Sequence, residues 1–94
     1  MNQAITFTNA RIKLYQRHVR EWHRLINHQQ TVWKLLDEET AGKLLAHQDD
    51  KAACVELRNT KMLRLTKILA AQRQERARMK ARHQNDLSLL EQSF

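Results

Sequence analysis

The near-absence of helix-breaking residues constrains this chain more than any other feature. The 94 residues contain no proline and a single glycine, Gly42. Proline and glycine are the residues that most strongly mark turns, whereas the leucine, alanine, arginine, lysine and glutamine that fill this sequence favour helix. Aromatic residues make up only 5% of the chain, which argues against a β-sandwich. We therefore expect an all-α fold built from long helices.

Apolar residues in the first third of the chain recur in seven-residue steps. Such rows place an apolar stripe along one side of a helix. Thr8 or Asn9 is expected to cap this helix, and with Thr8 as the cap, Phe7 and Ile12 are placed as a hydrophobic staple around it. The pattern predicts a helix over residues 8–36. One row consists of Ile5, Ile12, Val19, Ile26 and Trp33, and a second of Tyr15, Trp22 and Leu36, with Gln29 as its polar member.

Residues 37–50 form an acidic segment, with five acids against one lysine. Acidic side chains stabilise the N-terminal ends of helices. Asp37 is therefore expected to cap a short second helix, and Asp49 or Asp50 a third, with Gly42 weakening the short helix or marking a bend. The segment is either a helix with two bends or a looser connector.

The last helix is predicted over residues 51–92. Val55, Met62 and Leu69 continue a seven-residue step in its first half. Two long amphipathic helices separated by a short element predict one domain over residues 1–94. The expected fold is a coiled-coil-like antiparallel hairpin, with a short helix or bent connector between its helices.

Basic residues dominate the last helix and give the whole chain a net charge of +7. Such an excess favours a polyanionic partner, either nucleic acid or an acidic protein surface. Lysine and arginine contact phosphates without reading sequence, and a solvated helical face is the alternative interpretation. The residues expected to bind phosphate or an acidic surface are Arg64, Lys67, Arg73, Arg76, Arg78, Lys80 and Arg82.

The aromatic stripe of the first helix is the predicted protein interface. Two tryptophans and a tyrosine exceed what one facing helix with few aromatics covers, so a second copy or a different protein is expected to complete the core. Trp22 and Trp33 are either core residues or interface anchors of the kind that dominate binding energy. The predicted interface residues are Ile12, Tyr15, Val19, Trp22, Ile26 and Trp33.

No residues suggest catalysis, a metal site or a cofactor. His18, His23 and His28 recur every five residues, which makes their side chains diverge around a helix, so solvated histidines are expected. Ala41-Gly42-Lys43 lacks the upstream glycine and strand of a phosphate-binding loop. We expect neither an enzyme nor a small-molecule binder.

A cytoplasmic location is expected. No apolar run approaches the roughly 20 residues of a membrane span, the first residues do not resemble a secretory signal, and the single cysteine, Cys54, fits a reducing compartment.

Two functions follow from these patterns. The first is a small helical adaptor or inhibitor that binds a protein through the aromatic stripe, with basic residues steering it to an acidic surface. The second is an accessory protein, of the kind found in phages and plasmids, that binds DNA or RNA through the basic helix. A helix-turn-helix over residues 38–65 is disfavoured, because its turn has no glycine and starts with two acids near the phosphates.

Overall fold

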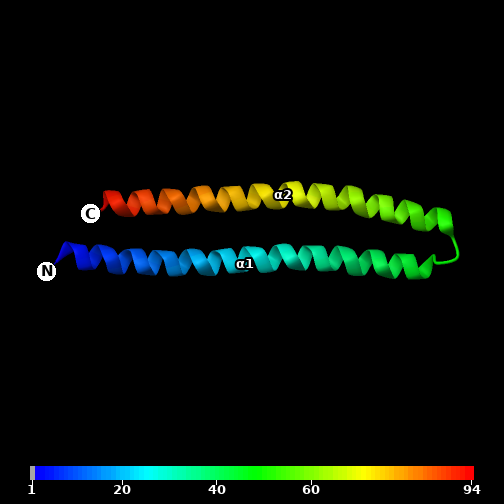
Figure 1. The fold of residues 1–94 in the computed structure, drawn as a ribbon, viewed down its shortest axis with the longest axis horizontal. Helices are drawn as coiled ribbons and strands as arrows, with labels where there is room; N and C mark the ends of the chain where they lie inside the picture. The colour runs from blue at the N-terminus through cyan, green and yellow to red at the C-terminus, as the bar shows by residue number, and fades with distance from the viewer. Residues whose placement is uncertain (1) are drawn as a thin grey trace. The chain divides into compact units, whose positions relative to one another are not determined.

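The computed structural model describes residues 2–94 as two helices joined by a short turn (Figure 1). Helix α1 spans Gln3–Ala46 and helix α2 spans Lys51–Gln92. The part of the chain that the structure describes contains no strand. The all-α helical hairpin predicted from composition and apolar spacing is confirmed.

Helix α1 begins earlier than the spacing indicated. The side-chain oxygen of Asn2 accepts a hydrogen bond from the backbone nitrogen of Ala4 at 2.9 Å, which satisfies one of the free N–H groups of the first turn. The predicted cap at Thr8 is therefore wrong, since Thr8 lies inside the helix. Phe7 packs instead against Phe94, with ring centroids 5.3 Å apart.

Most of the acidic segment is also helical, which corrects the predicted connector. Helix α1 continues through Asp37 and Gly42 to Ala46, and nothing lies within 4 Å of a Cβ built on Gly42. Asp37 does not cap a helix, because it lies inside α1, where its carboxylate pairs with Lys61 of α2 at 2.8 Å. Glu39 pairs with Arg64 of α2 and with Lys43 of α1, so acids of this segment have basic partners on both helices.

The connection between the helices is limited to residues 47–50. The side chain of Asp50 accepts a hydrogen bond from the backbone nitrogen of Ala53 at 3.0 Å, which is the geometry of a helix cap. The predicted cap at this position and the predicted range 51–92 for the last helix are both confirmed.

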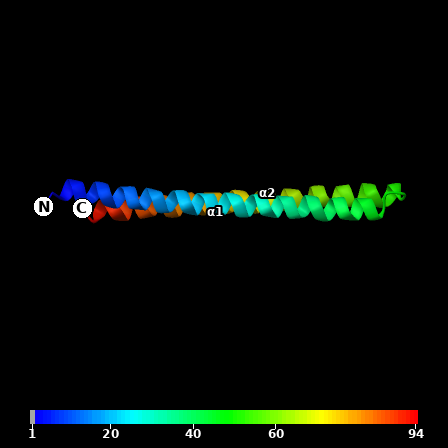
Figure 2. The same ribbon diagram turned by 90° about the horizontal axis from the view of Figure 1, so that it is seen from below.

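The contacts between α1 and α2 fall into two compact units. Figures 1 and 2 show the two helices from two sides. Unit 1 comprises the described part of Met1–Ile26 with Gln74–Phe94, drawn blue and orange to red. Unit 2 comprises Asn27–Arg73, which includes the turn. The two helices are antiparallel within each unit, because contacts join early residues of α1 to late residues of α2.

In unit 1 the helices meet through aromatic and imidazole rings. Phe7 contacts Phe94, and the buried rings of His18 and His83 stack with centroids 3.7 Å apart. Trp22 meets the His83 ring edge-on, with centroids 5.8 Å apart.

In unit 2 the helices meet through amides and one leucine. The side-chain amide of Gln29 donates to the backbone oxygen of Gln72, and the amide of Gln72 donates to the backbone oxygen of Gln29, both at 3.1 Å. Leu36, with 3% of its surface exposed, is the one buried apolar residue of the described chain. Thr40 is buried one turn further along α1.

The residues between the helices recur every eleven positions. Eleven residues make almost three full turns at 3.67 residues per turn, whereas a seven-residue row drifts by about 20° per heptad on a straight helix. The seven-residue row therefore does not follow the contact line. It starts on the exposed side at Ile5, which is 61% exposed, and drifts toward the contact line as far as Trp33, which is 37% exposed. The eleven-residue rows are Phe7, His18, Gln29 and Thr40 on α1, and Lys61, Gln72, His83 and Phe94 on α2.

Neither helix, within residues 2–94, has a stretch with the length and apolar character needed to cross a membrane.

Candidate protein interface on unit 1

The exposed apolar residues of α1 in unit 1 form the candidate interface, here called the apolar row. These side chains are between 42% and 61% exposed in the described chain. Part of the apolar row lines a shallow hollow together with Gln16 and Arg20. The apolar row consists of Ile5, Ile12, Tyr15, Val19 and Ile26.

Arg11 fixes the tyrosine of the apolar row. Its guanidinium donates a hydrogen bond to the Tyr15 hydroxyl at 3.2 Å and lies 5.6 Å from the ring centres of both Tyr15 and Phe7. Cation–π contacts of this kind hold a charged group over an aromatic face. The apolar row therefore carries a cation at its edge and a tyrosine in a defined orientation.

The two tryptophans of the predicted interface lie outside the apolar row. Trp22 is half-buried in unit 1, where it packs on His83. Trp33 belongs to unit 2, and its indole nitrogen donates to the side-chain oxygen of Gln72 at 2.7 Å. The structure thus brings Ile12, Tyr15, Val19 and Ile26 together on unit 1, while the tryptophans contact α2.

A polar layer that sequence reasoning missed lies beneath this surface. The Nε2 atom of His18 is 3.1 Å from a carboxylate oxygen of Asp86, and that of His83 is 3.1 Å from a carboxylate oxygen of Glu21. Each histidine therefore reaches an acid on the opposite helix. His18 is 5% exposed, so the expectation that it is solvated is wrong, whereas His23 and His28 are exposed.

Two arginines complete the polar layer. Arg17 lies 3.3 Å from Asp86, and Arg82 pairs with Glu21. The hydrogen bond from His83 is the main reason why the pKa of Glu21 lies below its ordinary value, and the hydrogen bond from His18 does the same for the pKa of Asp86. The two arginines and the two carboxylates of the polar layer carry opposite charges that balance.

The sequence contains a signal for this layer. Both helices carry an arginine-histidine pair followed three residues after the histidine by an acid, in Arg17-His18…Glu21 and Arg82-His83…Asp86. Residues three and four apart lie on the same side of a helix. When two helices with this pattern run antiparallel, the arginine-histidine pair of each helix lies beside the acid of the other helix.

The predicted basic residues are exposed, and they are divided between the units. Arg64 pairs with Glu39 at 3.1 Å, and Arg82 pairs with Glu21. The other five make no ion pair with any residue of the described chain. In unit 2 these are Lys67 and Arg73, and in unit 1 Arg76, Arg78 and Lys80.

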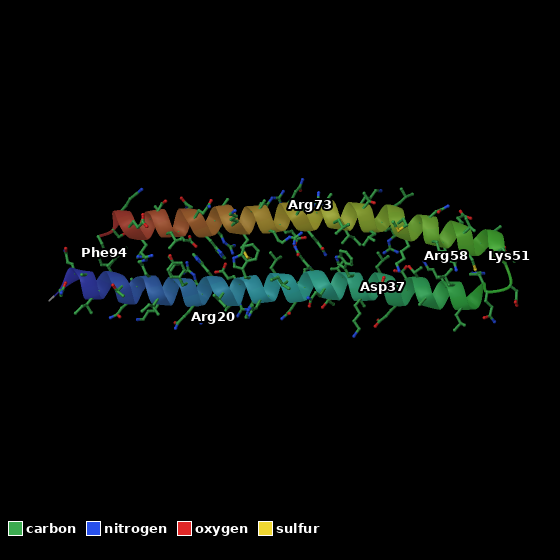
Figure 3. All side chains as sticks on the ribbon, viewed as in Figure 1. Arg20, Asp37, Lys51, Arg58, Arg73 and Phe94 are labelled. Carbon is green, nitrogen blue, oxygen red and sulfur yellow. The ribbon has the colours of Figure 1, made fainter. Side chains whose placement is uncertain are left out.

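Two of the labelled arginines in Figure 3 illustrate the division. Arg20 lies on α1 within unit 1, and Arg73 lies on α2 within unit 2.

No cluster of three or more histidine, cysteine or acidic residues within residues 2–94 has the geometry to hold a metal ion. Comparison of the chain with models of protein families, with curated proteins and with solved structures gives no match.

Proposed function

We propose that this chain is a helical binding module, an adaptor or inhibitor, that docks on an acidic protein partner through the apolar row of unit 1. The proposal includes no catalytic role, and it places the protein in the cytoplasm, where a single thiol stays reduced.

The observation that carries the proposal is the imbalance between buried and exposed apolar side chains. Among the described residues Leu36 is the one large apolar side chain that is buried, whereas thirteen are exposed. Apolar side chains scattered singly over a surface are ordinary, but a contiguous apolar patch marks a binding surface. The apolar row is contiguous along α1, because its members follow one another at steps of three, four or seven residues.

Charge favours an acidic partner over a second copy of this chain. Between Ile5 and Ile26 the sequence carries five basic residues and one acid, Glu21, which is already paired within unit 1. A second copy placed against this surface brings the same positive charge, whereas an acidic partner is attracted to it and associates faster at low salt.

Photo-crosslinking in the native cell tests the proposal. A photoreactive phenylalanine at Val19 is expected to yield a crosslinked complex with an acidic protein, identified by mass spectrometry. The same group at Gln30, an exposed residue of α1 in unit 2, is the matched control. Crosslinks at Val19 only to a second copy, or no crosslink there, contradict the proposal.

The purified partner then allows a quantitative test. Ile12→Glu with Val19→Glu is expected to weaken binding at least about 100-fold, or roughly 2.7 kcal/mol. Leu63→Glu, which changes a more exposed leucine of unit 2, is expected to leave affinity within about twofold. Equal losses in both variants contradict a site on the apolar row.

Nucleic-acid binding is a second candidate, favoured by the unpaired cations Arg76, Arg78 and Lys80. Lys80 lies four residues from Arg76 on one side of α2, while Arg78 lies on another side, so these cations do not form one face. The test is a titration with labelled DNA and RNA at about 50 and 200 mM salt. Affinity that falls by orders of magnitude, and that is lost when these three residues become alanine, supports this function.

A further inference from the structure

A groove in unit 1, distinct from the hollow on the apolar row, crosses from α1 to α2. Its volume is about 550 Å³. Ala10 and Leu14 of α1 and Leu89 and Leu90 of α2 supply its apolar surface. Leu89 is 54% exposed, so the wall on α2 is uncovered in the described chain. We call this site the open groove.

Three cations of α1 line the open groove. Lys13, Arg17 and Arg20 are spaced by four and three residues, so they follow one side of the helix over about 10 Å at 1.5 Å per residue. Asp86 is the one acid in the lining, and it is already within 3.3 Å of Arg17 and 3.1 Å of His18. Lys13 and Arg20 have no acidic partner among residues 2–94.

We infer that the open groove binds an acidic amphipathic helix of a partner protein. The apolar surface matches the apolar stripe of such a helix, since amphipathic helices dock into grooves through residues at i, i+3 or i+4 and i+7. The line of cations matches carboxylates at the same spacing on the flank of the incoming helix.

The charge pattern distinguishes this occupant from two others. An anionic lipid or fatty acid presents its charge at one end, whereas the cations here extend along the helix. A second copy of this chain brings a net charge of +7 to a site that is already basic. A helix with several acids along one flank neutralises the line of cations and covers Leu89 in the same contact.

The open groove also extends the proposed role of the chain. The hollow on the apolar row and the open groove share Arg20 but no apolar residue. A chain that binds one partner segment on each surface joins two segments, which is the behaviour of an adaptor. The inference does not require the apolar row to bind anything, and the two sites are tested by different variants.

The probe for the test is a fluorescent peptide of about 18 residues, or five helical turns. It carries leucines at a and d spacing and glutamates on one flank. Fluorescence anisotropy with the full chain is expected to show saturable binding with a dissociation constant of about 10 µM. A peptide with lysine in place of each glutamate is expected to bind at least tenfold more weakly, and binding of the acidic peptide is expected to weaken as salt rises.

Substitutions then locate the site. Leu89→Glu is expected to weaken peptide binding at least tenfold, and Lys13→Glu to weaken it similarly, while Leu63→Glu and the Ile12→Glu, Val19→Glu pair leave it within about twofold. Circular dichroism shows whether each variant keeps its helix content. A loss confined to the Ile12, Val19 pair places the peptide on the apolar row and overturns the inference.

Three other outcomes also overturn it. The first is binding of the lysine peptide with equal affinity, and the second is no binding of the acidic peptide at concentrations up to about 1 mM. The third is occupancy by another molecule. Competition by dodecanoate shows an anionic amphiphile site, and a dimer in sedimentation that Leu89→Glu dissociates shows a second copy in the groove.

Discussion

The two units are built from the same two helices, yet they are held together by different chemistry. Unit 1 joins its helices through stacked imidazoles that reach acids on the opposite helix. Unit 2 joins them through two glutamines that exchange hydrogen bonds with each other's backbone, beside Leu36. The buried contact line of unit 1 therefore includes charged groups that respond to pH, whereas the buried contact line of unit 2 is neutral and its inter-helix ion pairs, Asp37 with Lys61 and Glu39 with Arg64, lie outside it.

The comparison also explains where binding surfaces occur. Both units bury polar side chains at their contact line, since His18, Gln29, Thr40, Gln72 and His83 are all buried. Buried polar groups are costly unless they are hydrogen-bonded, and such pairs fix one alignment of the helices in preference to others. A polar contact line leaves apolar side chains outside, and in unit 1 these form the apolar row and the open groove.

The largest effect is expected from the apolar part of unit 2. Leu36→Ala is expected to lower the free energy of unfolding by about 3 kcal/mol, because it removes a buried side chain and leaves a cavity. The matched control is Leu35→Ala, which changes a neighbour that is 59% exposed and is expected to cost less than about 1 kcal/mol. Urea unfolding followed by circular dichroism measures both. Equal losses would show that Leu36 is not the centre of packing in unit 2.

The amide pair of unit 2 provides the next test. Gln72→Ala is expected to cost about 2 kcal/mol, because the amide of Gln72 bonds to both Gln29 and Trp33 and its removal leaves the Trp33 indole without its partner. Replacing both Gln29 and Gln72 by leucine is expected to cost less than the single change, because two apolar side chains of similar size fill the space of both amides, while the Trp33 indole loses its partner in either variant.

Gln30→Ala, next to Gln29 on the exposed side, is the control for the amide pair. It is expected to stay within about 0.5 kcal/mol of the unchanged chain. A double leucine variant less stable than Gln72→Ala would argue that the amides stabilise unit 2 rather than only align it.

Acid should weaken unit 1 through its carboxylates. The pKa values of Glu21 and Asp86 lie below the ordinary values of 4.5 and 3.8, so below those values the unfolded chain binds more protons than the folded chain. The stabilisation is fully present above these values and is lost as pH falls through the folded pKa values. Unfolding measured between about pH 7 and pH 2 is expected to show this decline.

Substituting the acids sharpens the contrast between the units. Glu21→Gln with Asp86→Asn is expected to cost about 1 kcal/mol at neutral pH and to flatten the acid dependence. Glu39→Gln is the control in unit 2, where the carboxylate pairs with Lys43 and Arg64 at the surface and its pKa is also lowered. If Glu39→Gln changes the acid dependence of stability more than Glu21→Gln with Asp86→Asn does, the acid-sensitive stabilisation belongs to unit 2 and not to unit 1.

The smallest effect on stability is expected from the apolar row. Ile12→Glu and Val19→Glu are each expected to change the free energy of unfolding by less than about 0.5 kcal/mol, because both side chains are about half exposed and line a hollow whose residues all belong to α1. Thermal unfolding measures this. A loss above about 1 kcal/mol would show that the apolar row supports the hairpin itself.

The sequence by itself determined the helical class, the second helix and its cap. A chain without proline, rich in helix formers and with apolar residues at helical spacing has few alternatives to long helices, and Asp50 is a cap recognisable from its residue type. The local signals at Thr8 and Asp37 were misleading, because capping residues and mid-helix residues of the same type look alike in sequence, and in the structure both residues lie inside α1.

Only the tertiary structure decided which residues lie between the helices. Rows at seven-residue and eleven-residue spacing both exist on α1, and apolar character alone favours the seven-residue row of Ile12, Val19 and Ile26. The eleven-residue row is mostly polar, so hydrophobicity does not reveal it. His18 and Gln29 of this row are buried because each finds a partner on α2, which is His83 for His18 and Gln72 for Gln29. Whether a polar residue has a partner depends on the residues of both helices, so the pattern along one helix does not reveal it.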